Sequence, residues 1–294
     1  MQSELLITWP KPIYELLEFV AAFLAIGPLG FRYGVARPTA AWAANGSTVR
    51  RVALRRAAAI GVVGAVLALT HVALVLPGLA ARRHTDVAGV IAGDPLVAAR
   101  VLLTGLAALG YLLAWRGREA GWAVAAVGMI GSILCNVVNG DWTQLVNPLH
   151  LLAGGLWIGT LFVLVAAGLA TVLTIEPSSE RRGELAASMV NTFSPQALAA
   201  AGSVVLFGVI TAWRHLKTLP ALWTTPYGYA LLAKLALVVL VFGLGAWNWR
   251  RQRPRLGSES AATRLRRSAW SELVAAGLVL LATALLVSLP APKH

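Results

Sequence analysis

The chain of 294 residues is 58% hydrophobic and 13% charged. Soluble domains carry about 25% charged residues, so the composition excludes an ordinary soluble protein. The formal net charge is +13, but the basic residues lie in the gaps between apolar segments and do not form one patch. A nucleic-acid-binding role is therefore not indicated. We expect an all-α protein embedded in a membrane.

Eight apolar segments have roughly the 20 residues that a helix needs to cross the hydrocarbon core of a bilayer. No basic region precedes the first segment, so we expect a retained span and not a cleaved signal peptide. The predicted spans are Tyr14–Val35, Ala57–Leu76, Leu96–Trp115, Gly121–Val138, Pro148–Leu173, Gln196–His215, Tyr229–Trp249 and Trp270–Leu289.

We expect one membrane domain over residues 1–294, with spans one to four in residues 14–138 and spans five to eight in residues 147–290. The longest connections, Ala36–Arg56 and Arg250–Ala269, are basic, about 20 residues long and predicted to be loops. Gly155 and Gly159 form a GxxxG pattern, which favours close packing of helix backbones.

The basic residues predict how the chain is oriented. Of the 25 Lys and Arg residues, 17 fall in one alternating set of connections and 7 in the other, while Lys234 lies inside a span. Short cytoplasmic loops carry the excess of Lys and Arg, so the first set is predicted to be cytoplasmic. Both termini are then expected on the opposite, external side.

All five histidines fall on this predicted external side: His71, His84, His150, His215 and His294. His150 follows Asn147, the expected N-cap of the fifth span, and His71 lies about 9 Å below the outer end of the second. Three helices that each supply one imidazole, from His71, His150 and His215, could form a trigonal nitrogen site for copper. Each histidine could equally be an interfacial or buried residue bonded to water, a carbonyl or a threonine.

Other polar residues near the same side are candidates for accessory roles. Glu15 and Glu18 share a face at the outer end of the first span, and Lys234 lies about five residues into the seventh. A carboxylate and an ammonium in one apolar region are expected to pair or to reach outward to water. Together with Asp141 they could instead form a vestibule that attracts cations.

Two further residues have both a structural and a functional interpretation. Cys135, the single cysteine, could add a thiolate ligand, although a lone buried cysteine usually acts as a small hydrophobic residue. Trp157 lies inside the fifth span, and core packing is the favoured interpretation. We find no Gly-rich phosphate loop, nucleophile elbow or HExxH motif, so we do not expect an enzyme.

The second half of the chain carries several motifs in a recognisable order. They are "HLLAGGLWIG", "FSPQALAAAGSVVLFGVITAWRHL", "TTPYGYALLAKLAL", "GAWNWRRQRPRL" and "RLRRSAWSELVAAGLVLLATALLVSLP". Over residues 147–290 this order resembles the copper resistance D (CopD) family of bacterial inner-membrane proteins. The first four spans are similar to the family in hydropathy and length.

The resemblance implies a multi-pass inner-membrane protein of eight helices that acts in copper homeostasis and takes copper from the periplasm. It also implies a periplasmic copper-binding partner of the CopC type. The resemblance implies that four residues on the shared motifs are functional positions: His150, Trp157, His215 and Lys234. Two alternatives stay open: electron transfer through a b-type haem held by paired imidazoles, and an accessory subunit of another membrane complex.

Overall fold

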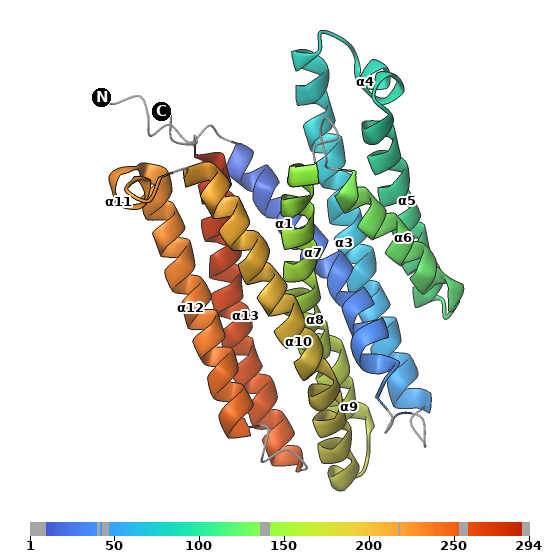
Figure 1. The fold of residues 1–294 in the computed structure, drawn as a ribbon. Helices are drawn as coiled ribbons and strands as arrows, with labels where there is room; N and C mark the ends of the chain where they lie inside the picture. The colour runs from blue at the N-terminus through green and yellow to red at the C-terminus, as the bar shows by residue number, and fades with distance from the viewer. Residues whose placement is uncertain are drawn as a thin grey trace.

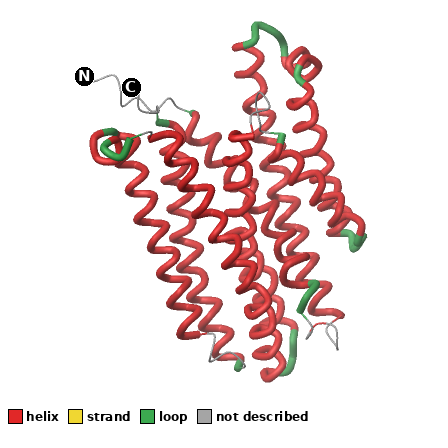
Figure 2. Tube along the Cα trace, in the orientation of Figure 1, coloured by secondary structure: helices red, strands yellow, loops and turns green. Residues whose placement is uncertain are grey.

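The structure is a computed structural model that describes residues 10–39, 42, 47–135, 142–216, 218–252 and 258–289. These residues are helical and contain no strand (Figure 2). The prediction of an all-α fold is confirmed. Asp141 and His294, two of the residues singled out in the sequence, lie outside the described residues.

Seven helical segments of the described chain are long and apolar enough to cross a membrane. They are α1 with η1 (Lys11–Gly30, Phe31–Ala36), α3 (Ser47–Arg82), α5 (Pro95–Trp115), α7 to α9 (Val146–Ile175, interrupted by η3 at Gly155–Gly159, α8 at Thr160–Val163 and η4 at Leu164–Leu169), α10 (Ser179–Leu216), α12 (Pro226–Gln252) and α13 (Glu259–Ser288).

The fourth predicted span corresponds to a shorter helix. As described, α6 (Ala120–Leu134) has 15 residues and is about 22 Å long, less than the roughly 30 Å of a hydrocarbon core. It packs along α5, where Gly110, Gly121 and Gly128 face backbone atoms of the partner helix. The short elements α4 (Val87–Gly93), η2 (Trp142–Leu145) and α11 (Ala221–Thr224) lie in the connections.

Several helices extend well beyond their apolar segments. The loops predicted at Ala36–Arg56 and Arg250–Ala269 are therefore shorter in the structure than expected. α3 begins at Ser47, so Arg50–Arg56 form helical turns, and α13 begins at Glu259, inside the predicted loop at Arg250–Ala269. α10 begins 17 residues before its apolar segment. Hydropathy reports where side chains meet lipid, whereas backbone hydrogen bonding continues a helix through polar turns.

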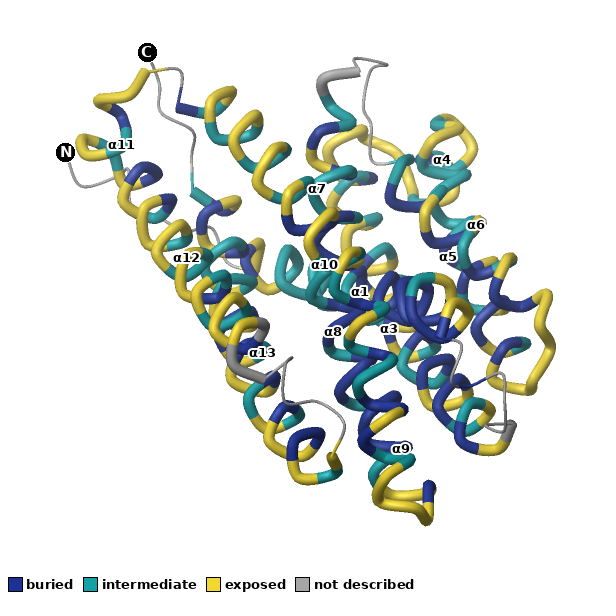
Figure 3. Tube along the Cα trace, turned by 60° about the horizontal axis from the view of Figure 1, so that its bottom comes forward, coloured by how far each residue is buried: buried dark blue, intermediate teal, exposed yellow. Residues whose placement is uncertain are grey.

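The segment α7 to α9 forms the centre of the bundle, with α3, α5 and α6 on one side and α10, α12 and α13 on the other (Figure 1). Within its apolar stretch 67% of the residues are buried, against 11% in α12. Figure 3 shows the same contrast between the buried middle and the exposed α12. The outer faces of α12 and α10 therefore offer apolar surface to lipid.

The closest backbone approach at the centre joins α1 to η3. A Cβ atom added at Gly27 would overlap the carbonyl of Gly159, and one added at Gly155 would meet Ile26. The close packing predicted from the Gly155/Gly159 pattern is confirmed. η1, η3 and η4 are π-helical, and short π-helical insertions in α-helices frequently occur at functional sites.

The beginning of α1 and the end of α13 lie at the same end of the bundle. Lys11 Nζ donates a hydrogen bond of 3.1 Å to the carbonyl of Val287. We call this the terminal end; α3 and α10 end there, and α7 and α12 begin there (Figure 1). The opposite end carries the Arg-rich turns that the sequence assigns to the cytoplasm.

Candidate metal-binding site

His150 lies in the second turn of α7, near the terminal end. The helix begins at Val146 as a continuation of η2, and its N-cap position is Leu145, so the predicted capping role of Asn147 is wrong. Asn147 instead joins two helices, because its Oδ1 accepts a hydrogen bond of 3.1 Å from Thr211 of α10. This bond helps to fix the face of α7 that meets α10.

The imidazole of His150 is enclosed between α7 and α10. A Cβ atom added at Gly208 would lie 3.2 Å from Cε1 of the ring, and the backbone of Val204, one turn earlier in α10, forms a hydrogen bond with the imidazole. Nδ1 of His150 is buried and has no hydrogen-bond partner among the described residues. A buried ring nitrogen without a partner is costly unless something binds it, and neutral imidazole nitrogen is a good ligand for copper.

Lys234 of α12 is a charged residue that acts on His150. The two side chains interact electrostatically, and Lys234 makes no ion pair within the described part of the chain. The expected pairing of Lys234 with the carboxylates of α1 is wrong, since Glu18 pairs with Arg100 of α5 at 2.7 Å. Helix α1 packs most extensively against α3, the helix that also packs against α5, which carries Arg100.

His215 lies two turns above Gly208 on α10, about 10 Å along the axis. Its Nδ1 is 2.8 Å from the carbonyl oxygen of Thr211, and its ring stacks on Tyr227 at 5.9 Å between ring centroids. A carbonyl oxygen only accepts, so Nδ1 carries the proton. Nε2 therefore keeps its lone pair for a ligand.

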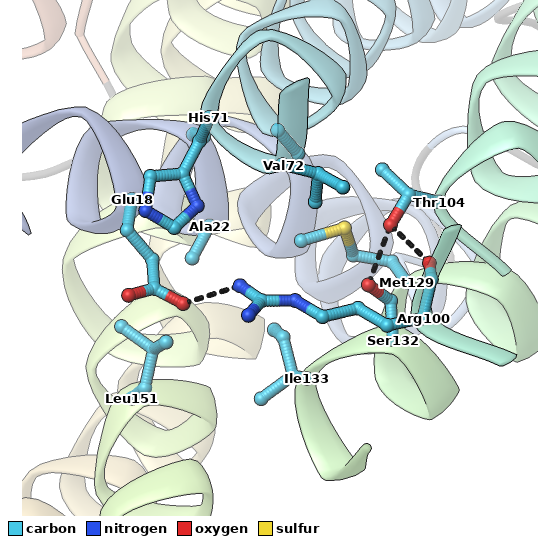
Figure 4. A pocket seen from close by; sticks show the side chains of 12 residues that line it. Glu18, Ala22, His71, Val72, Arg100, Thr104, Met129, Ser132, Ile133 and Leu151 are labelled. Carbon is cyan, nitrogen blue, oxygen red and sulfur yellow. Dashed lines mark hydrogen bonds and ion pairs between the residues drawn. The ribbon is translucent and has the colours of Figure 1, made fainter. Parts of the chain in front are cut away.

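His71 belongs to a different part of the bundle. It is buried on α3 and lines a cavity of about 20 Å³, large enough for one water molecule. Figure 4 shows His71 beside Glu18, whose carboxylate bonds to Arg100, while Thr104 and Ser132 bond to each other at 2.7 Å. The cavity is lined by both polar and apolar side chains.

Helix α7 separates the His71 cavity from His150. Leu151 lines the cavity, whereas its chain neighbour His150 faces α10. Within the ranges that the structure describes, no three His, Cys, Asp or Glu side chains lie close enough to hold one metal ion. The predicted single site of three imidazoles is therefore not assembled here. His150 of α7 packs against Gly208 of α10, and His215 lies two turns further along the same helix.

The remaining candidates have structural contacts. Cys135 is a free thiol directly after α6, and its backbone N–H bonds to the carbonyl of Gly131. Glu15 is half-buried on α1, one turn before Glu18. Trp157 of η3 packs on Phe242 of α12, with 4.8 Å between ring centroids. The favoured interpretation of Trp157 as a packing residue agrees with this contact.

Sequence reasoning missed a second polar cluster. Glu272 of α13 is buried, and Asn248 of α12 donates a hydrogen bond to it. A lone carboxylate inside an apolar segment was the available signal. Arg100, the partner of Glu18, was counted only as a basic residue of a connection.

The bundle and its buried polar residues define the class as a multi-pass helical membrane protein. Residues 187–286 match the model of the family described as "Copper resistance protein D". The predicted resemblance is confirmed over these residues, which include His215 and Lys234 but not His71 or His150. The match is shorter than the resemblance read from the motifs, which began at Asn147.

A curated relative is similar over a longer stretch. The chain is 30% identical over 155 residues, 51% of its length, to the "Copper transport protein CutJ" of Bacillus subtilis (strain 168). The aligned part covers 26% of that protein, so the chain spans about a quarter of the length of this relative. No solved structure matches the chain significantly.

Proposed function

We propose that this protein binds copper at its terminal end, on the periplasmic side of the bacterial inner membrane, and moves it across the bundle. The family match over residues 187–286 and the name of the relative support a copper-related role. The Lys and Arg distribution supports the orientation. In this proposal α6 belongs to an eighth span of one membrane domain.

The observation that carries the proposal is the buried, unpartnered Nδ1 of His150. This nitrogen lies in an apolar bundle, near the terminal end, and it is buried away from bulk water that could donate a hydrogen bond to it. Copper binds imidazole nitrogen more tightly than the other divalent first-row metals do. A copper ion bound to Nδ1 would remove the cost of leaving this nitrogen unpaired.

His215 supplies a second nitrogen nearer to the terminal end. Its fixed tautomer presents Nε2, and two turns of α10 separate it from the neighbour of His150. We therefore propose that His215 of α10 and His150 of α7 are successive copper-binding positions beside α10. His71 is a separate third copper-binding position on the other side of α7. A periplasmic donor of the CopC type would deliver copper to His215 first.

Copper uptake into phospholipid vesicles tests this proposal. Purified protein is compared with His150→Ala, His215→Ala and the double variant, and both uptake and bound copper are measured. His84→Asn is the matched control, since His84 is exposed in a turn with φ of +52°, a conformation that Asn tolerates. Equal uptake and equal bound copper in the double variant and the wild type would remove the proposal.

Two further measurements test the haem alternative and the proposed orientation. A Soret absorption band in protein expressed with sufficient haem would support the haem alternative. The single Cys135 reports the orientation, because a membrane-impermeant maleimide should label it from the periplasm of intact spheroplasts. Labelling only from the cytoplasmic side would reverse the proposed topology.

A further inference from the structure

Three polar residues form a cluster between α12 and α13, away from the histidines. Asn248 Nδ2 donates a hydrogen bond to Oε1 of Glu272, and Ser268 Oγ donates one to Oδ1 of Asn248. Glu272 is 9% exposed and Asn248 6%. The second carboxyl oxygen, Oε2, faces Gly245, where the missing side chain leaves it room. We call these three residues the inner cluster.

The inner cluster lies toward the end of the bundle opposite the terminal end, since Asn248 is four residues before the end of α12. Glu272 is 13 residues from the start of α13, about 20 Å along its axis. One turn further along α13, Ala276 packs with Val241 of α12 in an apolar layer. The cluster is therefore separated from the terminal end by apolar side chains.

One face of α12 connects the inner cluster with the region of His150. Lys234, Val241, Gly245 and Asn248 follow one another at intervals of seven, four and three residues, which places them on the same side of a helix. Lys234 interacts electrostatically with His150 at one end of this face, and Asn248 contacts Glu272 about 21 Å away at the other. We call this face and the residues packed on it the α12 seam.

The middle of the α12 seam is closed by apolar residues. Trp157 of η3 stacks on Phe242 next to Val241, and Ile158 packs on the same layer. Trp157 belongs to a π-helical insertion, and such insertions in α-helices frequently occur at functional sites. The seam thus has a polar position at each end and an aromatic barrier between them.

No basic side chain in the described part of the chain forms an ion pair with Glu272. On neighbouring elements Arg32 pairs with Glu119 and Arg182 with Glu259, while α8 and η4 contain no titratable residue. The other charged or titratable side chains that the structure describes on α13 and on the elements packed against it are Lys11, Tyr14, Glu15, Glu18, Glu180, Arg181, Glu184, Arg214, His215, Tyr227, Tyr229, Lys234, Arg250, Arg264, Arg266 and Arg267. A carboxylate charge here would have to be held by hydrogen bonds alone.

We infer that Glu272 is a proton-binding site, positioned by Asn248, and that its proton exchanges with the cytoplasm as a cation moves along the α12 seam. The step is a simple acid–base equilibrium: the carboxylate takes one proton from water and returns it. Burying an unpaired carboxylate costs free energy, and binding a proton removes that cost. The coupling to cation movement rests on the proposed function, whereas proton binding does not.

The hydrogen bonds favour a proton over a metal ion at this position. Ser268 donates to Oδ1 of Asn248, so the amide turns its NH₂ group toward Glu272. A metal ion there would meet that NH₂ group and a single carboxylate. The same NH₂ group can donate to an oxygen of the protonated acid or of the carboxylate, so both states keep this bond.

Labelling with dicyclohexylcarbodiimide tests proton binding without copper. This apolar reagent modifies carboxyl groups that are protonated in apolar surroundings. The whole protein in phospholipid vesicles is treated over a pH series, and the adducts are located by mass spectrometry of its peptides. We expect Glu272 to be labelled at neutral pH several times more than Glu184, which is exposed on α10. Equal labelling of the two residues at every pH would overturn the inference.

Two variants test the role of Asn248. Asn248→Leu removes a donor that stabilises the carboxylate, so labelling of Glu272 should persist to higher pH. Ser268→Ala keeps the amide and provides a milder test if Asn248→Leu does not fold. Glu272→Gln must lose the adduct. An unchanged pH dependence in both Asn248→Leu and Ser268→Ala would remove the positioning role.

Coupling is tested in vesicles that contain a pH-sensitive dye. Copper uptake by the wild type should be accompanied by proton movement, and Glu272→Gln should lose that movement at least tenfold, whereas Glu184→Gln should keep it. Copper uptake without proton movement in the wild type would overturn the coupling. If the wild type takes up no copper, the proposed function fails, and the carbodiimide result still decides whether Glu272 binds a proton.

Discussion

His150 of α7 and Gly208 of α10 are in direct contact, and the missing side chain of Gly208 creates the room for the imidazole. A Cβ atom at position 208 would lie 3.2 Å from Cε1 and 3.7 Å from Nδ1 of His150. Nδ1, the nitrogen without a hydrogen-bond partner among the described residues, thus lies beside a position of α10 that has no methyl group. Substitutions at Gly208 can therefore test whether copper binds in the space beside Nδ1, while His150 itself is kept.

We expect Gly208→Ala to weaken copper binding several-fold and Gly208→Val to weaken it further, because each places carbon atoms next to Nδ1. Alanine in a helix interior is favoured over glycine by up to about 1 kcal/mol, so the alanine variant should not lose stability through its backbone. Copper affinity measured by competition with a chelator checks the prediction.

Gly202→Ala is the matched control for this series. Gly202 lies on the same helix, and a Cβ atom there would meet nothing within 4 Å. Its copper affinity should equal that of the wild type. The same affinity in Gly208→Val and Gly202→Ala would mean that copper does not use the space between α7 and α10.

The helices could be predicted from the sequence because hydropathy alone identifies segments that prefer lipid. Each predicted span lies within or overlaps a described helix, but the ends were misplaced where a helix continues through polar turns. The first 16 residues of α10, before Pro195, are an example, since they contain Arg181, Arg182 and Glu184 yet remain helical. Backbone hydrogen bonds form irrespective of whether the side chains meet lipid or water.

The contacts of the candidate site could not be predicted, because they depend on the rotation of each helix and on its choice of neighbour. The position of His150 at the mouth of its span follows from the sequence, but its contact with Gly208 does not. The expected partner of Glu18 was Lys234, whereas the packing of α1 brings Arg100 next to it.

We expect Gly159→Ala to destabilise the protein by about 1–3 kcal/mol, the range for overpacking a well-packed core. A Cβ atom there would overlap the carbonyl of Phe23 and lie 3.2 Å from Cα of Gly27. Backbone atoms cannot turn aside as a flexible side chain can. The thermal unfolding midpoint in detergent should fall, and Gly243→Ala, where a Cβ atom meets nothing within 4 Å, should keep the wild-type midpoint or exceed it.

The ion pair of Glu18 and Arg100 should contribute to stability as a coupled unit. Each side chain is about one-fifth exposed, so replacing either one by Gln removes this ion pair from a partly buried charge, at a cost of about 1–3 kcal/mol. The double variant Glu18→Gln/Arg100→Gln should cost less than the two single variants added together. Denaturant titration of the four proteins measures the coupling, and strict additivity would show that the two residues do not interact.

Asp94 gives the protein a local stability that depends on pH. It caps α5 by accepting hydrogen bonds from the backbone N–H groups of Leu96 and Val97, and it pairs with Arg83 at 2.8 Å. The hydrogen bond from Arg83 holds the pKa of Asp94 below its usual range. Because the pKa is lower in the folded protein, the contribution is complete above the unfolded value of about 3.9 and is lost as the pH falls through the folded value.

Hydrogen exchange of α4 and the first turn of α5, corrected for the intrinsic rates, should therefore accelerate in the wild type as the pH falls below about 4. Asp94→Asn keeps a capping side chain but cannot ionise, so its protection should be lower at neutral pH and should lack this acid-dependent loss. Asp94→Ala also removes the cap and should cost about 1 kcal/mol of local stability. An acid-dependent loss of the same size in Asp94→Asn and the wild type would show that another group is responsible.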